Sequence, residues 1–189
     1  MIQLSVFMWL MAILFGYIGF TRGWSKELIA TSGIILGLFA LFQFDDTLSE
    51  LLIAVPADQK FLIRAVIFAV IVFFAYQTRA LIGEDVDKAE KSRRRGGANQ
   101  DGRDNLQSSV LGALIGLLNG YLIWGSLWYF MHVTNYPLSP YISAPLPGTM
   151  SADFVQSLPL YLLAGGPTGS GDLLAGAVIV LFLIVLVVI

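Results

Sequence analysis

The chain has 189 residues, of which 57% are hydrophobic and 13% are charged, and its formal net charge is -2. These fractions and the mean hydropathy of +0.77 lie outside the range of soluble globular domains, so water is not its main solvent. The chain has no cysteine and a single histidine, which excludes disulfides, thiol catalysis and a zinc site built from several imidazoles. We expect no metal and no cofactor.

Long apolar runs dominate the sequence. A helix needs about 20 mostly apolar residues to cross the hydrocarbon core of a bilayer. We therefore predict an all-α fold, a polytopic transmembrane helix bundle of about five spans, in which residues 1–189 form a single membrane domain. The predicted spans cover residues 2–20, 28–44, 61–82, 110–131 and 173–189.

The first run lacks the basic start and the cleavage pattern of a secretory signal, so we expect it to stay in the mature protein. Arg22 and Lys26 follow it directly. Basic residues favour the cytoplasmic side, so we expect the N-terminus outside and residues 21–27 as a cytoplasmic turn. A connection this short also predicts that the first two spans are antiparallel neighbours.

This turn carries the most distinctive local pattern of the chain, formed by Gly19, Arg22, Gly23 and Glu27. Gly23 is expected to adopt a backbone conformation that other residues disfavour. Glu27 would stand in the first turn of the next helix, where the helix dipole favours a negative charge. Arg22 could pair with Glu27, anchor to lipid phosphates, or contact a substrate or ion, and the sequence leaves these alternatives open.

Small residues recur four apart in two of the predicted spans. Such stripes let helix backbones approach closely in lipid, with a partner helix in the same chain or in a second copy. They consist of Gly33 and Gly37 in the second span and of Gly112, Gly116 and Gly120 in the fourth. Asn119 lies near the middle of the fourth span, where a buried amide needs a hydrogen-bond partner. We interpret Asn119 as a residue that makes an interhelical hydrogen bond or, alternatively, as a polar group on a transport pathway.

The predicted loops alternate in charge. The connection after the second span is acidic and is placed outside, and a capping box from Thr47 to Glu50 predicts a short interfacial helix that ends before Pro56. Residues 83–105 are expected to be a flexible basic cytoplasmic loop. Its basic cluster should contact anionic lipid and not nucleic acid, because acidic residues offset its charge and no aromatic residues interleave it. This cluster consists of Lys88, Lys91, Arg93, Arg94 and Arg95.

Residues 132–172 contain no Lys or Arg and are rich in proline and glycine. They are therefore placed outside, as a loop that contains an interfacial helix capped by Ser151. Pro159 weakens the continuation of that helix. The last span would then return the C-terminus to the cytoplasm.

The pattern of Gly19, Arg22, Gly23 and Glu27 resembles the colicin V production protein family of bacterial inner-membrane proteins. Residues 111–120 are similar to the glycine-rich late helix of that family, which usually carries an Arg-Gly pair, and here Asn119 replaces the arginine. The resemblance covers residues 2–163. It implies a four-span core in the bacterial inner membrane, to which residues 173–189 are an addition.

The resemblance implies a role in toxin production or export, or in envelope maintenance, without enzymatic chemistry. Our first functional hypothesis is therefore a non-enzymatic inner-membrane scaffold whose partners are membrane lipid and either a further copy of the chain or another membrane protein. The alternative is a small oligomeric channel or carrier built around the glycine-lined helices. An intramembrane enzyme ranks third, because the spans lack a Ser-His or Asp-Asp arrangement.

Overall fold

The computed structural model describes residues 3–77 and 101–188. Four of its helices are long and apolar enough to cross a membrane: α1 (Leu4–Arg22), α2 (Trp24–Gln43), α4 (Ala57–Gln77) and the stretch Leu106–Val133 of α6 (Asp101–Val133). A fifth apolar helix, α9 (Asp172–Val188), is shorter, with 17 residues. Short helices join them: α3 (Asp45–Leu51), α7 (Met150–Phe154), the 3-10 turn Val155–Ser157 and α8 (Pro159–Ala164). The all-helical, polytopic fold class is confirmed.

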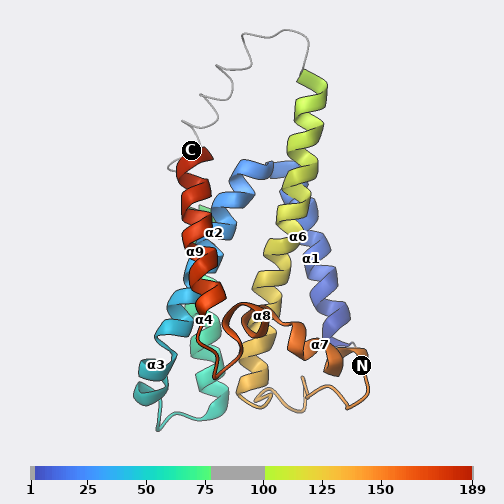
Figure 1. The fold of residues 1–189 in the computed structure, drawn as a ribbon. Helices are drawn as coiled ribbons and strands as arrows, with labels where there is room; N and C mark the ends of the chain where they lie inside the picture. The colour runs from blue at the N-terminus through green and yellow to red at the C-terminus, as the bar shows by residue number, and fades with distance from the viewer. Residues whose placement is uncertain (1–2, 78–100, 189) are drawn as a thin grey trace.

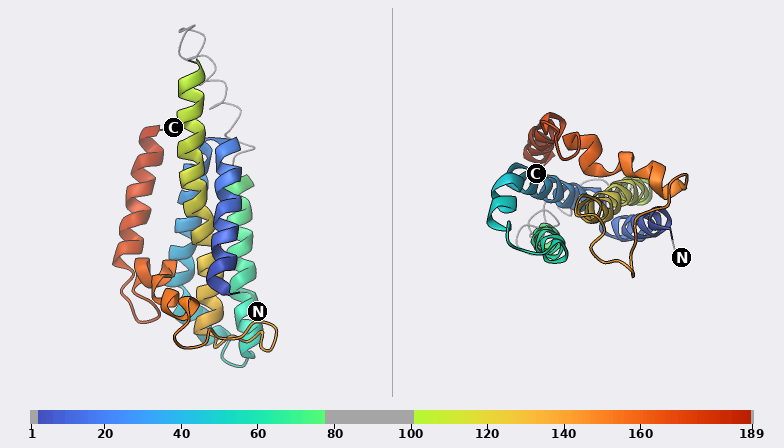
Figure 2. Two further views of the ribbon diagram at one scale, coloured as in Figure 1. Left: turned by 90° about the vertical axis from the view of Figure 1, so that its right-hand side faces the viewer. Right: turned by 90° about the horizontal axis from the view of Figure 1, so that it is seen from below.

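Successive long helices run in alternating directions (Figure 1). The connection between α1 and α2 and the C-terminal end of α9 lie at the end of the bundle that we call the turn end. The N-terminus and residues 134–171, which we call the lid segment, lie at the opposite end, the lid end (Figures 1 and 2). The alternation of the helices agrees with the predicted order of the spans.

Helix α2 lies inside the bundle and packs against α4, α6 and α9, whereas α1 packs mainly along α6 (Figure 2). Buried apolar side chains from these helices, including Met8, Ile34, Leu38 and Phe68, form one continuous core with residues of the lid segment. Leu174 of α9 belongs to this core and is fully buried. The outer faces of the long helices expose large apolar side chains, as expected of surfaces that contact lipid.

The turn between α1 and α2 is tighter than predicted. Helix α1 ends at Arg22 and α2 begins at Trp24, so only Gly23 separates them. Gly23 has a φ of 86°, in the region that favours glycine, and its backbone N–H donates to the carbonyl oxygen of Gly19 at 2.9 Å. Residues 24–26, expected in the turn, belong instead to the first turn of α2, and Glu27 stands in that helical turn as predicted.

The glycines of the fourth predicted span face α1 of the same chain. A Cβ added to Gly116 or Gly112 would overlap the backbone carbonyl oxygen of Phe15 or Gly19, and a Cβ on Gly120 would lie 2.6 Å from the Cα of Ala12. Only glycine permits this approach of two backbones. Although α1 and α2 are consecutive and antiparallel, they contact each other only slightly, and α6 is the helix against which α1 packs.

The other pair of glycines serves a second interface within the chain. A Cβ on Gly33 would lie 2.6 Å from the Cβ of Ala75, and a Cβ on Gly37 would overlap the side chain of Ile71. Both contacts join α2 to α4. The two glycine stripes are thus occupied by helices of the same chain.

The short helices depart from the predicted capping. Helix α3 starts at Asp45, before the predicted box, and no side chain caps its first turn. In the lid segment Thr149, not Ser151, caps α7 by accepting a hydrogen bond from the N–H of Ala152 at 3.3 Å. The Ser151 hydroxyl instead lies 2.8 Å from that of Ser5 in α1, because a buried hydroxyl needs a partner.

The helix that begins at Met150 does not continue through Pro159, as predicted, and Pro159 begins a separate helix. It stands at the first position of α8, where its missing N–H costs nothing. The lid segment is packed against the bundle: Leu158 is fully buried, and the ring of Phe154 stacks on Trp128 of α6 at 6.2 Å. Residues 83–100 of the predicted basic cytoplasmic loop, with the cluster from Lys88 to Arg95, lie outside the described residues. Residues 101–105, predicted as part of the flexible loop, are instead the start of α6.

Candidate functional site

Five polar side chains meet inside the bundle near the turn end. Arg22 comes from the last turn of α1, Glu27 and Thr31 from the start of α2, Tyr76 from the end of α4, and Asn119 from the middle of α6. Every helix of membrane-spanning length among the described residues therefore contributes at least one group. We call this set the polar cluster.

Glu27 is the centre of the polar cluster. It is fully buried, and its carboxylate accepts from donors on three other helices. Oε1 accepts from the Arg22 guanidinium at 2.7 Å. Oε2 accepts from the Asn119 side-chain amide at 2.9 Å and from the Tyr76 hydroxyl at 3.1 Å. A buried carboxylate is tolerated only with such compensation, because its loss of hydration is expensive.

Asn119 and Thr31 complete the hydrogen bonding around the backbone of α2. The Asn119 amide also donates to the carbonyl oxygen of Glu27 at 3.2 Å. The Thr31 hydroxyl lies 2.7 Å from the Asn119 side-chain oxygen and 2.8 Å from the Glu27 carbonyl oxygen, and its single proton serves one of them at a time. Both residues are buried, and the Asn119 amide has the partners that a buried amide requires.

Arg22 makes a second contact besides the ion pair. Its guanidinium carbon lies 4.4 Å from the centroid of the Tyr76 ring, a distance at which the cation is attracted to the ring face. The ring of Tyr76 in turn meets that of Phe15 edge-on at 5.9 Å. The Arg22 side chain is 14% exposed, so the arginine lies at the margin of the cluster and the glutamate at its centre.

The structure brings together three of the residues that the sequence singled out, Arg22, Glu27 and Asn119, and Gly19 and Gly23 lie on either side of Arg22 in the chain. It adds Thr31 and Tyr76, which the sequence analysis missed. Thr31 follows Glu27 by four residues and so lies on the same helix face, a signal that was available. Tyr76 had no such signal, because its place beside Glu27 depends on how α4 packs on α2.

The lid end has polar contacts of a different kind. The Arg64 guanidinium pairs with Asp45 at 2.8 Å and donates to the Ser49 hydroxyl at 2.9 Å, which ties α4 to α3. Beyond the end of α6, the Tyr136 hydroxyl accepts from the Trp128 indole at 3.1 Å. Burial raises the pKa of Tyr136, and the hydrogen bond from Trp128 opposes this shift. These groups hold connecting segments in place and do not reach the polar cluster.

The apolar helices that enclose a fully paired polar cluster define the chain as a polytopic helical membrane protein. Over residues 4–158 it matches the family described as Colicin V production protein, and it therefore belongs to that family. A search of curated proteins and a search of solved structures each found no match. The matched region includes α1, α2, α4, α6 and the whole polar cluster, and it ends before α9.

Proposed function

We propose that this chain is a non-enzymatic scaffold of the bacterial inner membrane that serves toxin production or export, or envelope maintenance. The observation that supports the proposal is the polar cluster: Glu27 is fully buried and engaged by Arg22, Tyr76 and Asn119. Groups so engaged fix the arrangement of four helices. A transported ion would have to displace these contacts before it could bind.

The positions of the glycines support the same proposal over an oligomeric channel. The stripe containing Gly116 faces α1, and the stripe containing Gly37 faces α4, both in the same chain. A channel built on these stripes would need them free to meet a second copy. The scaffold that we propose has its turn end in the cytoplasm, the side that residues 83–105 would also occupy under the charge rule.

A complementation experiment can distinguish a polar cluster that only stabilises the fold from a polar cluster that takes part in chemistry or transport. Cells that lack the native gene and carry a colicin V system are complemented with the wild-type chain, with Glu27→Gln, or with Glu27→Gln combined with Arg22→Met. The single substitution leaves a cation with no counter-charge, whereas the double substitution removes both charges. Secreted toxin and the amount of chain in the membrane are measured together.

For a scaffold, toxin secretion should follow the amount of folded chain, so the double variant should recover much of what the single variant loses. A double variant that is abundant in the membrane yet inactive would contradict the scaffold. The two charges would then be required for activity and not only for folding. If secretion is unchanged in cells without the chain, and detergent sensitivity is also unchanged, then both proposed roles are wrong.

A further inference from the structure

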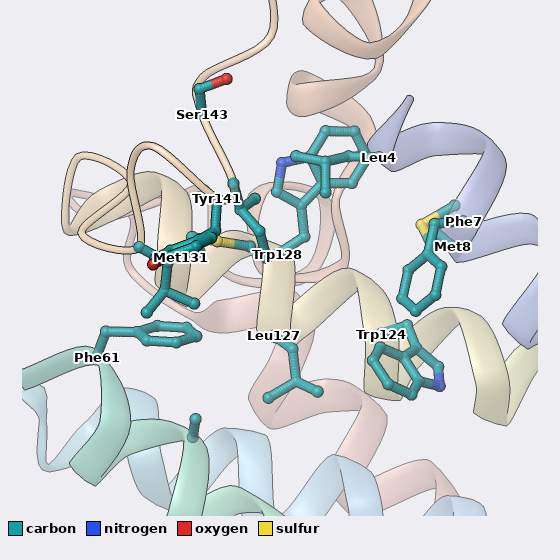
Figure 3. A pocket seen from close by; sticks show the side chains of 13 residues that line it. Leu4, Phe7, Met8, Phe61, Trp124, Leu127, Trp128, Met131, Tyr141 and Ser143 are labelled. Atoms are coloured by element: carbon teal, nitrogen blue, oxygen red, sulfur yellow. The ribbon is translucent and has the colours of Figure 1, made fainter. Parts of the chain in front are cut away.

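At the lid end the bundle contains an apolar groove of about 600 Å³ (Figure 3). Its floor is α6, with Trp124, Leu127 and Met131. Its walls are the first turns of α1 on one side and of α4 on the other. Residues 138–143 of the lid segment close the end of the groove that faces away from the polar cluster. The open side therefore lies between α1 and α4.

The lining of the groove selects the chemistry of its occupant. Among the side chains that line it are Phe7, Met8, Phe61 and Ala65, and none of the lining residues is charged. The lid segment that closes it contains no Lys or Arg, so it offers no cation to a phosphate. Water would be a poor occupant, because apolar cavities hold it weakly. A lining that is mainly apolar favours a hydrocarbon occupant.

The groove is continuous with the surface of the protein that contacts lipid. On α1, Leu10 and Leu14 are 54% and 49% exposed, and on α4, Leu62 is 49% exposed. These side chains face the bilayer on the two helices that flank the groove. The groove is therefore a recess in the lipid-facing surface, which acyl chains can reach sideways without crossing a polar region.

The size of the groove decides between a lipid chain and a protein partner. An α-helix with its side chains is about 10 Å across, so a space of about 600 Å³ holds little more than a single turn of one. A flexible, narrow acyl chain fits such a space, and filling it restores the dispersion contacts that an empty recess lacks. We propose that this groove binds one acyl chain of a bilayer lipid, and that it recognises the chain and not the headgroup.

The groove contains its own reporter for a test in lipid vesicles. Substituting Trp9 and Trp24 by Phe leaves Trp124 and Trp128 as the only tryptophans, and both line the groove. This protein is reconstituted in phosphatidylcholine that carries bromine on its acyl chains, which quenches tryptophan on contact. We expect strong quenching, and an equal extent of quenching when phosphatidylglycerol with the same brominated chains replaces phosphatidylcholine.

Two substitutions on one face of α4 provide the comparison. Ala65→Phe places a ring in the groove and should reduce the quenching, whereas Ala69→Phe, one helical turn further on at an exposed position, should leave it unchanged. Native mass spectrometry of the chain with all four tryptophans is the second readout. It should show a lipid retained by the wild type and by Ala69→Phe and lost from Ala65→Phe.

Groove tryptophans that bromine does not quench would overturn the proposal, whether the groove is empty or covered by a second copy of the chain. Equal quenching in Ala65→Phe and Ala69→Phe would also overturn it, because the reporter would then sense the general lipid surface. Quenching that depends on the headgroup would overturn the claim that the chain is what is recognised.

Discussion

At the turn end α1 and α6 approach until backbone meets backbone at Gly19 and Gly112, and a buried glutamate joins four helices by its side chain and its backbone. At the lid end the same two helices are joined by large aromatic side chains, and a groove of about 600 Å³ separates α1 from α4. In lipid, the hydrophobic effect does not drive the association of helices at either end. The turn end therefore depends on a few specific contacts that tolerate little change, and the lid end on many adaptable ones.

Loss of the carboxylate should produce the largest effect. Glu27→Gln keeps a hydrogen-bond acceptor for Asn119 and Tyr76 but leaves the Arg22 cation without its counter-charge. We expect a loss of about 3 kcal/mol in the free energy of unfolding, measured by SDS titration in mixed micelles. The double variant with Arg22→Met should lose clearly less. Equal losses in the two variants would show that the unpaired Arg22 cation is not the cause of the loss.

The close contact of α1 and α6 comes next. Gly116→Ala places a Cβ against the carbonyl oxygen of Phe15 and should lower the free energy of unfolding by about 2 kcal/mol. The matched control is Gly176→Ala in α9, where a Cβ would meet nothing within 4 Å, and which should be neutral or slightly stabilising. If the two variants unfold alike, the backbone contact is looser than described.

A single hydroxyl of the polar cluster should matter less. Tyr76→Phe removes the bond to Glu27 at 3.1 Å but keeps a ring under Arg22, so we expect a loss of about 1 kcal/mol. Tyr17→Phe, at a residue that is 71% exposed, is the control and should not change the unfolding curve. A Tyr76→Phe protein as stable as its control would remove this tyrosine from the cluster.

A comparably small effect is expected at the lid end. Ser151→Ala removes two hydrogen bonds between the lid segment and α1, one accepted from the Ser5 N–H at 3.3 Å and one with the Ser5 hydroxyl at 2.8 Å, each worth about 0.6 kcal/mol. The measurement is the same SDS titration, with the exposed Ser143→Ala as the control. A loss as large as that of Glu27→Gln would reverse the comparison, because the lid end would then also depend on a single specific contact.

Sequence-based prediction succeeded where the information is local. The apolar composition of a run such as residues 110–131 is enough to predict that it contacts lipid. The order of loop charges predicted the alternation of the helices. The pattern from Gly19 to Glu27 indicated the family that the match over residues 4–158 confirms. Errors arose at helix ends: α2 already begins at Trp24, inside the turn predicted over residues 21–27, and α6 begins at Asp101, inside the predicted loop.

The sequence by itself determined that this chain is a bundle of apolar helices, that Gly23 makes a tight turn, and that Asn119 needs a partner. Only the tertiary structure decided that the partner is Glu27, which is distant in sequence, that the glycine stripes face helices of the same chain, and that α1 and α4 leave a groove between them. The reason is physical: burial in lipid depends on the composition of each segment, whereas pairing depends on which faces of distant segments meet. No local pattern contains that information.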